Sequence, residues 1–471
     1  MNHYTPFDKS FSHLQTDDLV ALKEVNEGWY VEYKQAIPKS QSIAKSVSAF
    51  ANSYGGWLFY GIKEESKENS VAGEFLGIDS TEVDTVLQRI RQAVANLINP
   101  SCHFESKVFY GPCAQLNIEA GRAIICIAIP QSAEAPHIHS SGYIYRRIAD
   151  GSEPIPETDR HMVDRLYQRS KDTINSYKKW HDEDPEFSDT EINTPFLRIM
   201  IKPNLWHLPR SDFRIDIENA REILGAKTGR TICLPFDTIY SRAGGLTARQ
   251  CENNDPSNHG MTWNVNPDLT GDIIIPLSWS KGSLDQIEAR LFGYEYSGIF
   301  IDALKKANIQ EPHIVDLNYV YNVLMGIVEA QRALQKLAGW PLEFHLKIKL
   351  LNVWRTIPFL DIEYIINYIR RHGIPMCLTR STTSPIGHHP NTFKYIKDHA
   401  DGDDHSKAIL QTLTSFIPIA QAYGLPLTQM LLDECENNET EETEETEPTF
   451  IQLNNAATRG VAITSSYNKK Q

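Results

Sequence analysis

Residues 40–62 read SQSIAKSVSAFANSYGGWLFYGI, a helix-like segment followed directly by a strand-like one. The apolar residues of the first part recur at helical spacing, at Ile43, Val47, Phe50 and Ala51. A serine precedes the first turn and a glycine pair follows the last, so the pattern predicts a helix with defined ends. The following WLFYGI is rich in β-forming residues and predicts a strand.

The segment upstream, residues 26–37, reads NEGWYVEYKQAI and predicts another strand by its alternation. Side chains two residues apart share a face of a strand, so Glu32 and Lys34 should project together. A carboxylate that can bind a divalent cation, beside an ammonium that can steady a phosphate, is typical of metal-dependent nucleases. Alternating Glu and Lys also form ordinary solvated strand faces, so this pair alone leaves both interpretations open.

Two further carboxylates are candidates for the same site. Glu27 lies five residues before Glu32, and the turn-forming Asn26 and Gly28 could bring its carboxylate back to the face of Glu32. Glu64 follows the predicted WLFYGI strand, and a strand end can turn a side chain toward a neighbouring strand.

A chain of 471 residues favours two domains over a single core. Residues 18–151 alternate strand-like runs with helical periodicity, and a polar helix is predicted from Thr158 to Trp180. The composition then becomes rich in Asp, Glu and Pro, and near the C-terminus it becomes low in complexity and strongly acidic. We predict an N-terminal domain at 1–180, a linker at 181–194, a second domain at 195–430 and an acidic disordered tail at 431–471.

The second domain shows both kinds of periodicity. Apolar runs predict strands at 196–202, 231–236, 272–280 and 344–354. Helical spacing predicts helices at 315–337, 361–371 and 404–423. The expected fold class of the whole chain is therefore α/β in the broad α+β sense, with a mixed sheet and helices in each domain.

The charge balance does not exclude a nucleic-acid binder. The formal net charge is -14, but nine acidic residues between Asp433 and Glu447 supply much of it. No run of eighteen apolar residues occurs, and the first residues lack the layout of a signal peptide. Seven scattered cysteines without a CxxC pair suit a reducing compartment, so we expect a cytoplasmic protein with no membrane association.

The VEYK of residues 31–34, followed by SAFANSYGGWLFYGI and then acidic residues, resembles the Schlafen domain family. The pattern of that family runs E-F-K and then S-A-F-A-N-T-x-G-G-x-L-x-x-G-V-D-D. The similarity continues through IPQSAEAPHIHSSGYIYRRIADGS at 129–152, which is similar to the Pro-His segment and Tyr-x-Arg strand of the family. It covers about the first third of the chain.

The resemblance implies a catalytic and metal-binding site at Glu27, Glu32 and Glu64, with Lys34 stabilising charge. In nucleolytic members the third carboxylate is an Asp, so Glu64 departs from the pattern by one methylene, which leaves its metal preference open between Mg²⁺ and Mn²⁺. The implied reaction is hydrolysis of a phosphodiester. Positive charge for phosphate contacts is expected from Lys45, Arg146 and Arg147.

The function expected from the resemblance is a metal-dependent endoribonuclease that cleaves tRNA or other structured RNA, with RNA favoured over DNA. By analogy with modular defence proteins, it would be an effector in antiviral or stress defence, regulated by a trigger that the second domain senses. A single lobe also implies a homodimer or higher homo-oligomer. The alternatives are a non-catalytic transcriptional regulator and an ATP-binding switch, although no GxxxxGK[ST] motif occurs.

Structural zinc is a weaker candidate. The cysteines and histidines of the first domain do not have the spacing of a standard zinc finger, so buried thiols and surface imidazoles are favoured over a site. The residues concerned are Cys102, His103, Cys113, His137 and His139.

Overall fold

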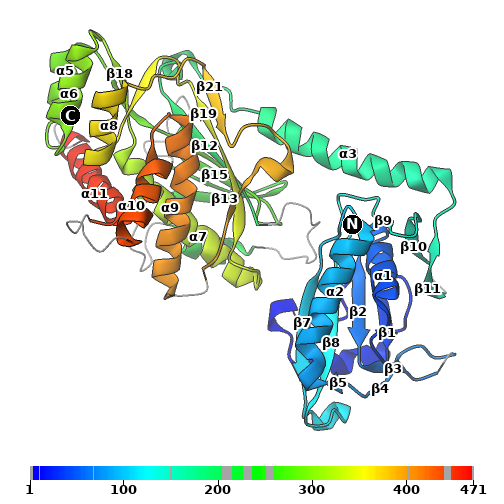
Figure 1. Cartoon of the computed structure of the whole chain (residues 1–471). Coiled ribbons are helices and arrows are strands. Elements are labelled where there is room, and N and C mark those ends of the chain that lie inside the picture. Colours follow the sequence, from blue (N-terminus) through cyan, green and yellow to red (C-terminus); the bar gives the residue numbers. More distant parts are fainter. Residues whose placement is uncertain are drawn as a thin grey trace. The chain divides into compact units, whose positions relative to one another are not determined.

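The structure is a computed structural model that describes residues 4–9, 11–66, 68–148, 151–203, 215–225, 236–250, 259–399, 402–439 and 447–468. The chain divides into two compact units, unit 1 up to Glu183 and unit 2 from Asp184 (Figure 1). Each unit mixes helices with strands, which confirms the expected α/β (α+β) class. Among the described helices, none has the length and apolar character needed to cross a bilayer.

Five strands form the central sheet of unit 1: β1 (Val31–Lys34), β2 (Gly56–Tyr60), β5 (Ile78–Asp79), β7 (Glu105–Tyr110) and β8 (Arg122–Ile129). Their order is β1-β2-β8-β5, and β7 also pairs with β8. β1 and β2 run parallel with Glu32 opposite Leu58, whereas β8 is antiparallel to its neighbours. The crossover between β1 and β2 is the helix predicted from the sequence, α1 (Ser40–Asn52).

Alternating side chains of the sheet build two cores. On one face, Leu58 and Tyr60 pack with apolar residues of α1 and of α2 (Val83–Leu97), as Figure 1 shows for the helices. On the other face, Trp57 and Phe59 pack with residues of the 3-10 helix Thr16–Glu24. The alternation of side chains along each strand therefore determines which residues enter the core on each face of the sheet.

The glycine pair after α1 is required by close approach as well as by conformation. Gly55 has a φ of +74°, and a Cβ there would lie 2.6 Å from the Gln131 nitrogen. A Cβ on Gly56 would lie 2.4 Å from the Phe50 ring. Only glycine fits both positions, which explains the abrupt change from helix to strand.

The remaining elements of unit 1 are short hairpins and one long helix. β3 pairs with β4, β6 with β9, and β10 with β11, all antiparallel. The 3-10 turns are Phe11–His13, Ser80–Glu82 and Ala114–Leu116. The bounds of the others are β3 (Ile62–Glu64), β4 (Ala72–Phe75), β6 (Ile98–Asn99), β9 (Ile138–His139), β10 (Tyr145–Ile148), β11 (Gly151–Pro156) and α3 (Arg160–Asp182).

Unit 2 contains an eight-stranded antiparallel sheet in the order β13-β14-β15-β16-β12-β19-β21, with β22 also paired to β19. A smaller sheet has the order β17-β18-β20, in which β18 and β20 are parallel. The strands are β12 (Phe196–Lys202), β13 (Thr238–Arg242), β14 (Gly245–Arg249), β15 (Thr262–Val265), β16 (Gly271–Pro276), β17 (Ser278–Lys281), β18 (His313–Asp316), β19 (Phe344–Leu351), β20 (Thr356–Phe359), β21 (Ser381–Ser384) and β22 (Lys394–Ile396).

Eight helices also belong to unit 2 in the described part of the chain, and α9 packs against both α7 and β19. Two short 3-10 turns, Asp189–Glu191 and Pro390–Thr392, complete the unit. The helices are α4 (Ile217–Leu224), α5 (Leu284–Arg290), α6 (Ser297–Lys306), α7 (Asn318–Ala338), α8 (Glu363–His372), α9 (Asp404–Ala422), α10 (Leu427–Glu439) and α11 (Thr449–Asn468).

Most predicted elements of unit 2 appear close to their expected positions. The predicted strand at 272–280 is interrupted at Leu277, and its two halves, β16 and β17, belong to different sheets. The predicted long helix begins only at Asn318, because residues just before it form β18. Of the strand predicted at 231–236, residues 231–235 lie outside the described residues.

Of the segment predicted as a linker, residues 181–194, the part from Asp184 on belongs to unit 2, whereas residues 181–183 belong to unit 1. The Asp184 carboxylate pairs with Arg198 at 3.2 Å and with Lys349 at 2.6 Å, and both cations are almost closed to solvent. The Phe187 ring stacks on Phe196 at a centroid distance of 4.4 Å. The acidic composition that suggested a free linker instead supplies counter-charges for basic residues on the sheet.

The structure differs from the disordered tail predicted at 431–471 in two places, because residues 431–439 belong to α10 and residues 449–468 form α11. α11 buries Leu453, Ala456 and Ala457 and packs against α7. The Arg459 guanidinium also lies 2.6 Å from the Asp361 carboxylate. Apolar residues at helical spacing resume after Thr449, and the acidic composition of the preceding run obscured them. The acidic residues 440–446 lie outside the described residues.

Candidate functional site

Glu32 lies at the centre of a buried charge cluster. Its carboxylate pairs with Arg147 at 2.9 Å and with Lys34 at 3.0 Å, and it accepts a hydrogen bond from the Ser46 hydroxyl at 3.1 Å. Only 1% of the Glu32 surface is exposed. The shared-face prediction for Glu32 and Lys34 is therefore confirmed, and both Glu32 oxygens are engaged by protein donors. We call Glu32, Lys34, Ser46 and Arg147 the Glu32 cluster.

Arg147 is part of the core and not of the surface. Its guanidinium donates to the Gly28 carbonyl at 2.6 and 3.2 Å and lies 4.6 Å from the centroid of the Phe50 ring. Its backbone N–H donates to the Ser53 hydroxyl at 2.9 Å, and its side chain is fully closed to solvent. As arranged, the Tyr-x-Arg arginine balances the buried Glu32 charge and presents no group at the surface for the predicted phosphate contact.

Glu27 occupies a different environment. The Gly28 N–H donates to the Val31 carbonyl at 3.0 Å, which closes the predicted turn, and the Glu27 carboxylate accepts the backbone N–H of Tyr33. Burial raises the pKa of Glu27 to about 7, and the negative charges of Glu32 and Glu64 add to this rise. A carboxyl that titrates near neutral pH can give or take a proton under ordinary conditions.

Glu64 lies at the end of β3, opposite Ala72 of β4. Its negative charge is one of the smaller causes of the raised pKa of Glu27. In the described part of the chain, however, no three Asp, Glu, His or Cys side chains converge in a way that could hold a metal ion. Mg²⁺ requires several oxygen ligands in near-ideal octahedral geometry, and those of Glu32 already bind protein donors. As arranged, the three glutamates do not fit a shared metal centre.

The other two predicted phosphate contacts differ from each other. The Lys45 ammonium lies 5.3 Å from the centroid of the Tyr145 ring, and its ion partner at 3.3 Å, Glu153, is mostly exposed. Arg146 pairs at 2.8 Å with Glu157, whose side chain is buried. Lys45 therefore keeps a cation on the surface, whereas Arg146 is tied to a structural partner.

The histidine candidates for zinc have other partners, and the two cysteine candidates are buried. The His137 ring nitrogen Nδ1 lies 2.7 Å from the Pro100 carbonyl, and burial lowers the pKa of this residue. The His139 ring contacts the Ser141 hydroxyl at 2.8 Å. Cys102 and Cys113 are both buried. His103 is also engaged in a polar or ring contact.

Asn52, inside the SAFANSYGG motif, is a structural residue that the sequence interpretation missed. Its side-chain amide donates to the carbonyls of His137 at 2.9 Å and Tyr145 at 3.1 Å, and it accepts the His137 N–H at 2.7 Å. The side chain is buried. Asn52 therefore fixes the end of α1 against β10, the strand that carries Tyr145 and Arg147. A polar residue inside an apolar helical stretch was the available signal.

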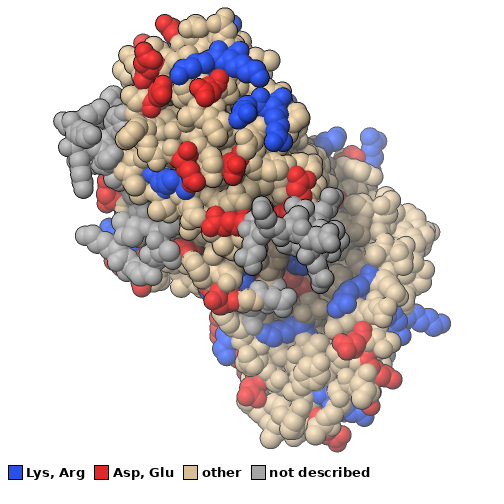
Figure 2. All heavy atoms as spheres, turned by 60° about the vertical axis from the view of Figure 1, so that its left-hand side comes forward, with Lys and Arg blue, Asp and Glu red and all other residues tan. Residues whose placement is uncertain are grey.

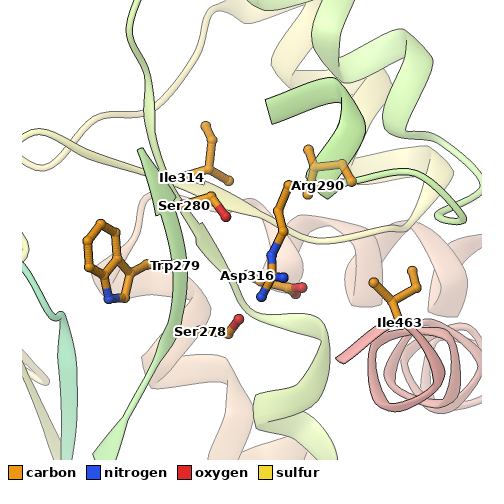
Figure 3. A pocket seen from close by; sticks show the side chains of 8 residues that line it. Ser278, Trp279, Ser280, Arg290, Ile314, Asp316 and Ile463 are labelled. Carbon is orange, nitrogen blue, oxygen red and sulfur yellow. The ribbon is translucent and has the colours of Figure 1, made fainter. Parts of the chain in front are cut away.

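In the described part of unit 2, two of the concave sites carry no sequence motif. A narrow pocket beside β17 and β18 is lined by Ser278, Arg290 and Asp316, and Figure 3 shows the Arg290 side chain extending toward Asp316. A larger groove of about 560 Å³ lies between α8, α10 and α11, with Tyr364 and Tyr368 among its lining residues. Neither site was predicted, because the lining residues come together only in the fold.

Surface charge is mixed. Figure 2 shows Lys and Arg side chains interspersed with Asp and Glu on the face that it draws. Phosphate binding would therefore depend on local clusters of cations and not on a field of one sign across the face.

Comparison with known protein families identifies a match within unit 1. Residues 27–156 match the family model described as Schlafen, AlbA_2, which confirms the resemblance of the N-terminal third and indicates a nucleic-acid-related function. Among solved structures, the crystal structure of the DIP2311 protein from Corynebacterium diphtheriae is similar at 19% identity, with a TM-score of 0.19. The match covers 35% of this chain and 35% of that protein. No curated protein matches.

Proposed function

We propose that unit 1, with its Schlafen-type domain, is a nucleic-acid-binding module whose favoured partner is RNA. The observation that carries the proposal is the position of Lys45, whose ammonium lies 5.3 Å from the centroid of the Tyr145 ring. The Tyr143 ring lies 6.1 Å from Tyr145 and is well exposed. A surface cation beside open aromatic rings supplies both phosphate attraction and a face for bases.

The geometry favours binding over cleavage. Glu32 is closed to solvent and engaged by Arg147, Lys34 and Ser46, so its role in the Glu32 cluster is structural. Removing one partner of such a buried pair costs several kcal/mol. A protein that holds nucleic acid without cutting it, such as a transcriptional regulator, needs a binding surface like the one around Lys45. It does not need a metal centre.

Fluorescence anisotropy tests the proposal. The full chain would be titrated against labelled structured RNA, unstructured RNA and duplex DNA in EDTA at several salt concentrations. Lys45→Ala should weaken binding to every RNA and reduce the slope of log K against log salt by about one. The control is Lys305→Ala, which removes an exposed lysine of unit 2 that is also paired with a glutamate. Equal curves for Lys45→Ala and the wild type would refute the role of Lys45.

A metal-dependent endoribonuclease is the second candidate. It is favoured by Glu27, whose pKa is raised by burial to about 7 and whose neighbours include Lys34 and Glu64. A proton-transferring carboxyl next to an ammonium suits phosphodiester hydrolysis. The effector role in antiviral or stress defence, with unit 2 as regulator, belongs to this candidate.

Cleavage assays separate the two candidates. Structured RNA would be incubated with the full chain in Mg²⁺, Mn²⁺ or EDTA, beside Glu27→Gln. The second candidate predicts cleavage that requires metal and disappears in Glu27→Gln without loss of RNA binding. The binding module predicts intact RNA in every lane.

A further inference from the structure

We propose that four aromatic residues at one corner of unit 1 form a stacking platform for unpaired nucleotides. The residues are Tyr4, Trp29, Tyr30 and Tyr54, and we call them the aromatic corner. The inference rests on the proposed nucleic-acid binding and adds the class of ligand, which is single-stranded segments of RNA or DNA. The aromatic corner is separate from the rings beside Lys45.

The rings of the aromatic corner form one continuous row. Tyr4 stacks on Tyr30 at a centroid distance of 4.9 Å, Tyr30 lies 6.2 Å from Tyr54, and Tyr54 lies 5.5 Å from Trp29. Three separate segments contribute these rings: the N-terminus, the turn before β1, and the end of α1. The fold therefore assembles a surface that no local sequence pattern shows.

Two rings of the aromatic corner are open to solvent, and the other two, Trp29 and Tyr30, are half-buried. Tyr54 is 47% exposed and Tyr4 is 39% exposed, whereas Trp57, which lies close by in the fold, is buried in the core. Contiguous exposed apolar surface on a soluble protein usually marks a site of interaction. Stacking on such rings is tolerant of sequence, because every base has a π face. Bases inside a duplex are already stacked, so the surface selects unpaired ones.

Positive charge lies next to the rings. The Arg169 guanidinium donates to the carbonyls of Asn52 at 3.2 Å and Ser53 at 3.5 Å, which directly precede Tyr54. Arg165 lies one helical turn before Arg169 on α3, and its positive charge adds to the burial that lowers the Arg169 pKa. Neither arginine has a carboxylate partner within the described ranges. In a protein of net charge -14, the Arg169 guanidinium next to Tyr54, with Arg165 one turn away on the same helix, supplies positive charge that attracts a nucleic-acid backbone.

The platform is held rigid before any ligand binds. Arg147 holds the Gly28 carbonyl, and the Trp57 N–H donates to the Tyr30 carbonyl at 2.7 Å. Gly55, which follows Tyr54, is fixed by its close approach to Gln131. Little conformational freedom is left to lose on binding, which favours affinity.

The competing explanation is that the row only anchors the N-terminal segment. The Trp57 indole N–H donates to the Tyr4 carbonyl at 3.3 Å, which is an anchoring contact. An anchor predicts that loss of Tyr54 lowers thermal stability without changing affinity for nucleic acid. A platform predicts that loss of Tyr54 lowers the affinity for nucleic acid without lowering thermal stability. The two explanations can therefore be separated by measuring both quantities.

The test is anisotropy with a labelled unstructured RNA and a duplex of the same sequence, using the full chain. Tyr54→Ala should weaken binding of the unstructured RNA by about 10-fold, whereas Tyr54→Phe, which keeps the ring, should stay within about twofold of the wild type. Tyr110→Ala is the control, because Tyr110 is also in unit 1 and is 54% exposed. Binding of the duplex should be the same for all four proteins.

A second variant covers the case in which Tyr54→Ala does not fold. Arg165→Ala changes an exposed helix residue and should reduce both the affinity for unstructured RNA and its salt dependence. Unchanged affinity in folded Tyr54→Ala, or an equal loss for the duplex, would overturn the platform while leaving the proposed function in place. Absence of binding to any nucleic acid by the wild type would overturn both.

Discussion

The Glu32 carboxylate lies 2.9 Å from the Arg147 guanidinium, and the exposed fractions of the two residues are 1% and 0%. The pair joins β1 to β10 across 115 positions of the chain. Glu32→Ala leaves this guanidinium buried without its counter-charge, so we expect unit 1 to lose about 3–5 kcal/mol of unfolding free energy. Urea unfolding followed by circular dichroism measures the loss.

A double variant separates charge from packing in the same pair. Glu32→Leu combined with Arg147→Met removes both charges and should destabilise unit 1 less than Glu32→Ala alone, because no fully buried guanidinium is left without its carboxylate and Lys34, the other ion partner of Glu32, is 28% exposed. If Glu32→Ala unfolds like the wild type, Glu32 does not stabilise unit 1 through its pair with Arg147. If Glu32→Ala loses an activity, the stability of the variant must be measured as well, because unfolding of unit 1 would also abolish the activity.

Glu27 makes stability depend on pH. Burial raises its pKa from 4.5 to about 7, so between these values the folded chain keeps a proton that the unfolded chain has released. Stability should therefore fall as pH rises through this window and level off above it. Glu27→Gln should flatten this part of the profile and be more stable than the wild type by about 1–2 kcal/mol at pH 8, since partial exposure screens the effect. Parallel profiles for the two proteins would contradict the assignment.

Asn52 gives a prediction for the family motif. Asn52→Ala leaves the His137 N–H and two carbonyls without their side-chain partner, so we expect a loss of about 1–3 kcal/mol in unit 1. Asn69→Ala, in the exposed turn between β3 and β4, should stay within about 0.5 kcal/mol of the wild type. Thermal unfolding compares the two, and similar midpoints would show that the Asn52 contacts do not stabilise the fold.

Asp184 tests whether the segment predicted as a linker belongs to unit 2. Asp184→Ala removes the carboxylate that lies 2.6 Å from the nearly buried Lys349 ammonium and weakens the charge balance of Arg198. We expect unit 2 to lose about 1–2 kcal/mol, while unit 1 unfolds as before. The neighbouring Asp189→Ala is the control, and equal unfolding of both variants would indicate a free linker.

Much of unit 1 could be predicted from its sequence because local signals and tertiary packing agree there. The helix at 40–52, the strands on either side of it and the shared face of Glu32 and Lys34 all follow from periodicity. The positive φ of Gly55 follows from its place after a helix.

The site itself depended on information that periodicity does not contain. Whether Glu32 faces solvent or a buried arginine is decided by Arg147, which lies far away in the sequence. The segment around Asp184 and the helix α11 were misassigned because composition was averaged over runs in which charged residues have specific partners. A charged composition predicts a solvated segment only where its charged residues lack specific partners in the fold.

The most direct test of nucleic-acid binding without catalysis is anisotropy of labelled structured RNA with the wild-type chain, in EDTA and in Mg²⁺, followed by electrophoresis of the same samples. We predict saturable binding in EDTA, similar affinity in Mg²⁺, and RNA of full length after both titrations. Binding that requires Mg²⁺, with cleaved RNA that stays intact when the protein carries Glu27→Gln, would contradict the binding module and establish the nuclease.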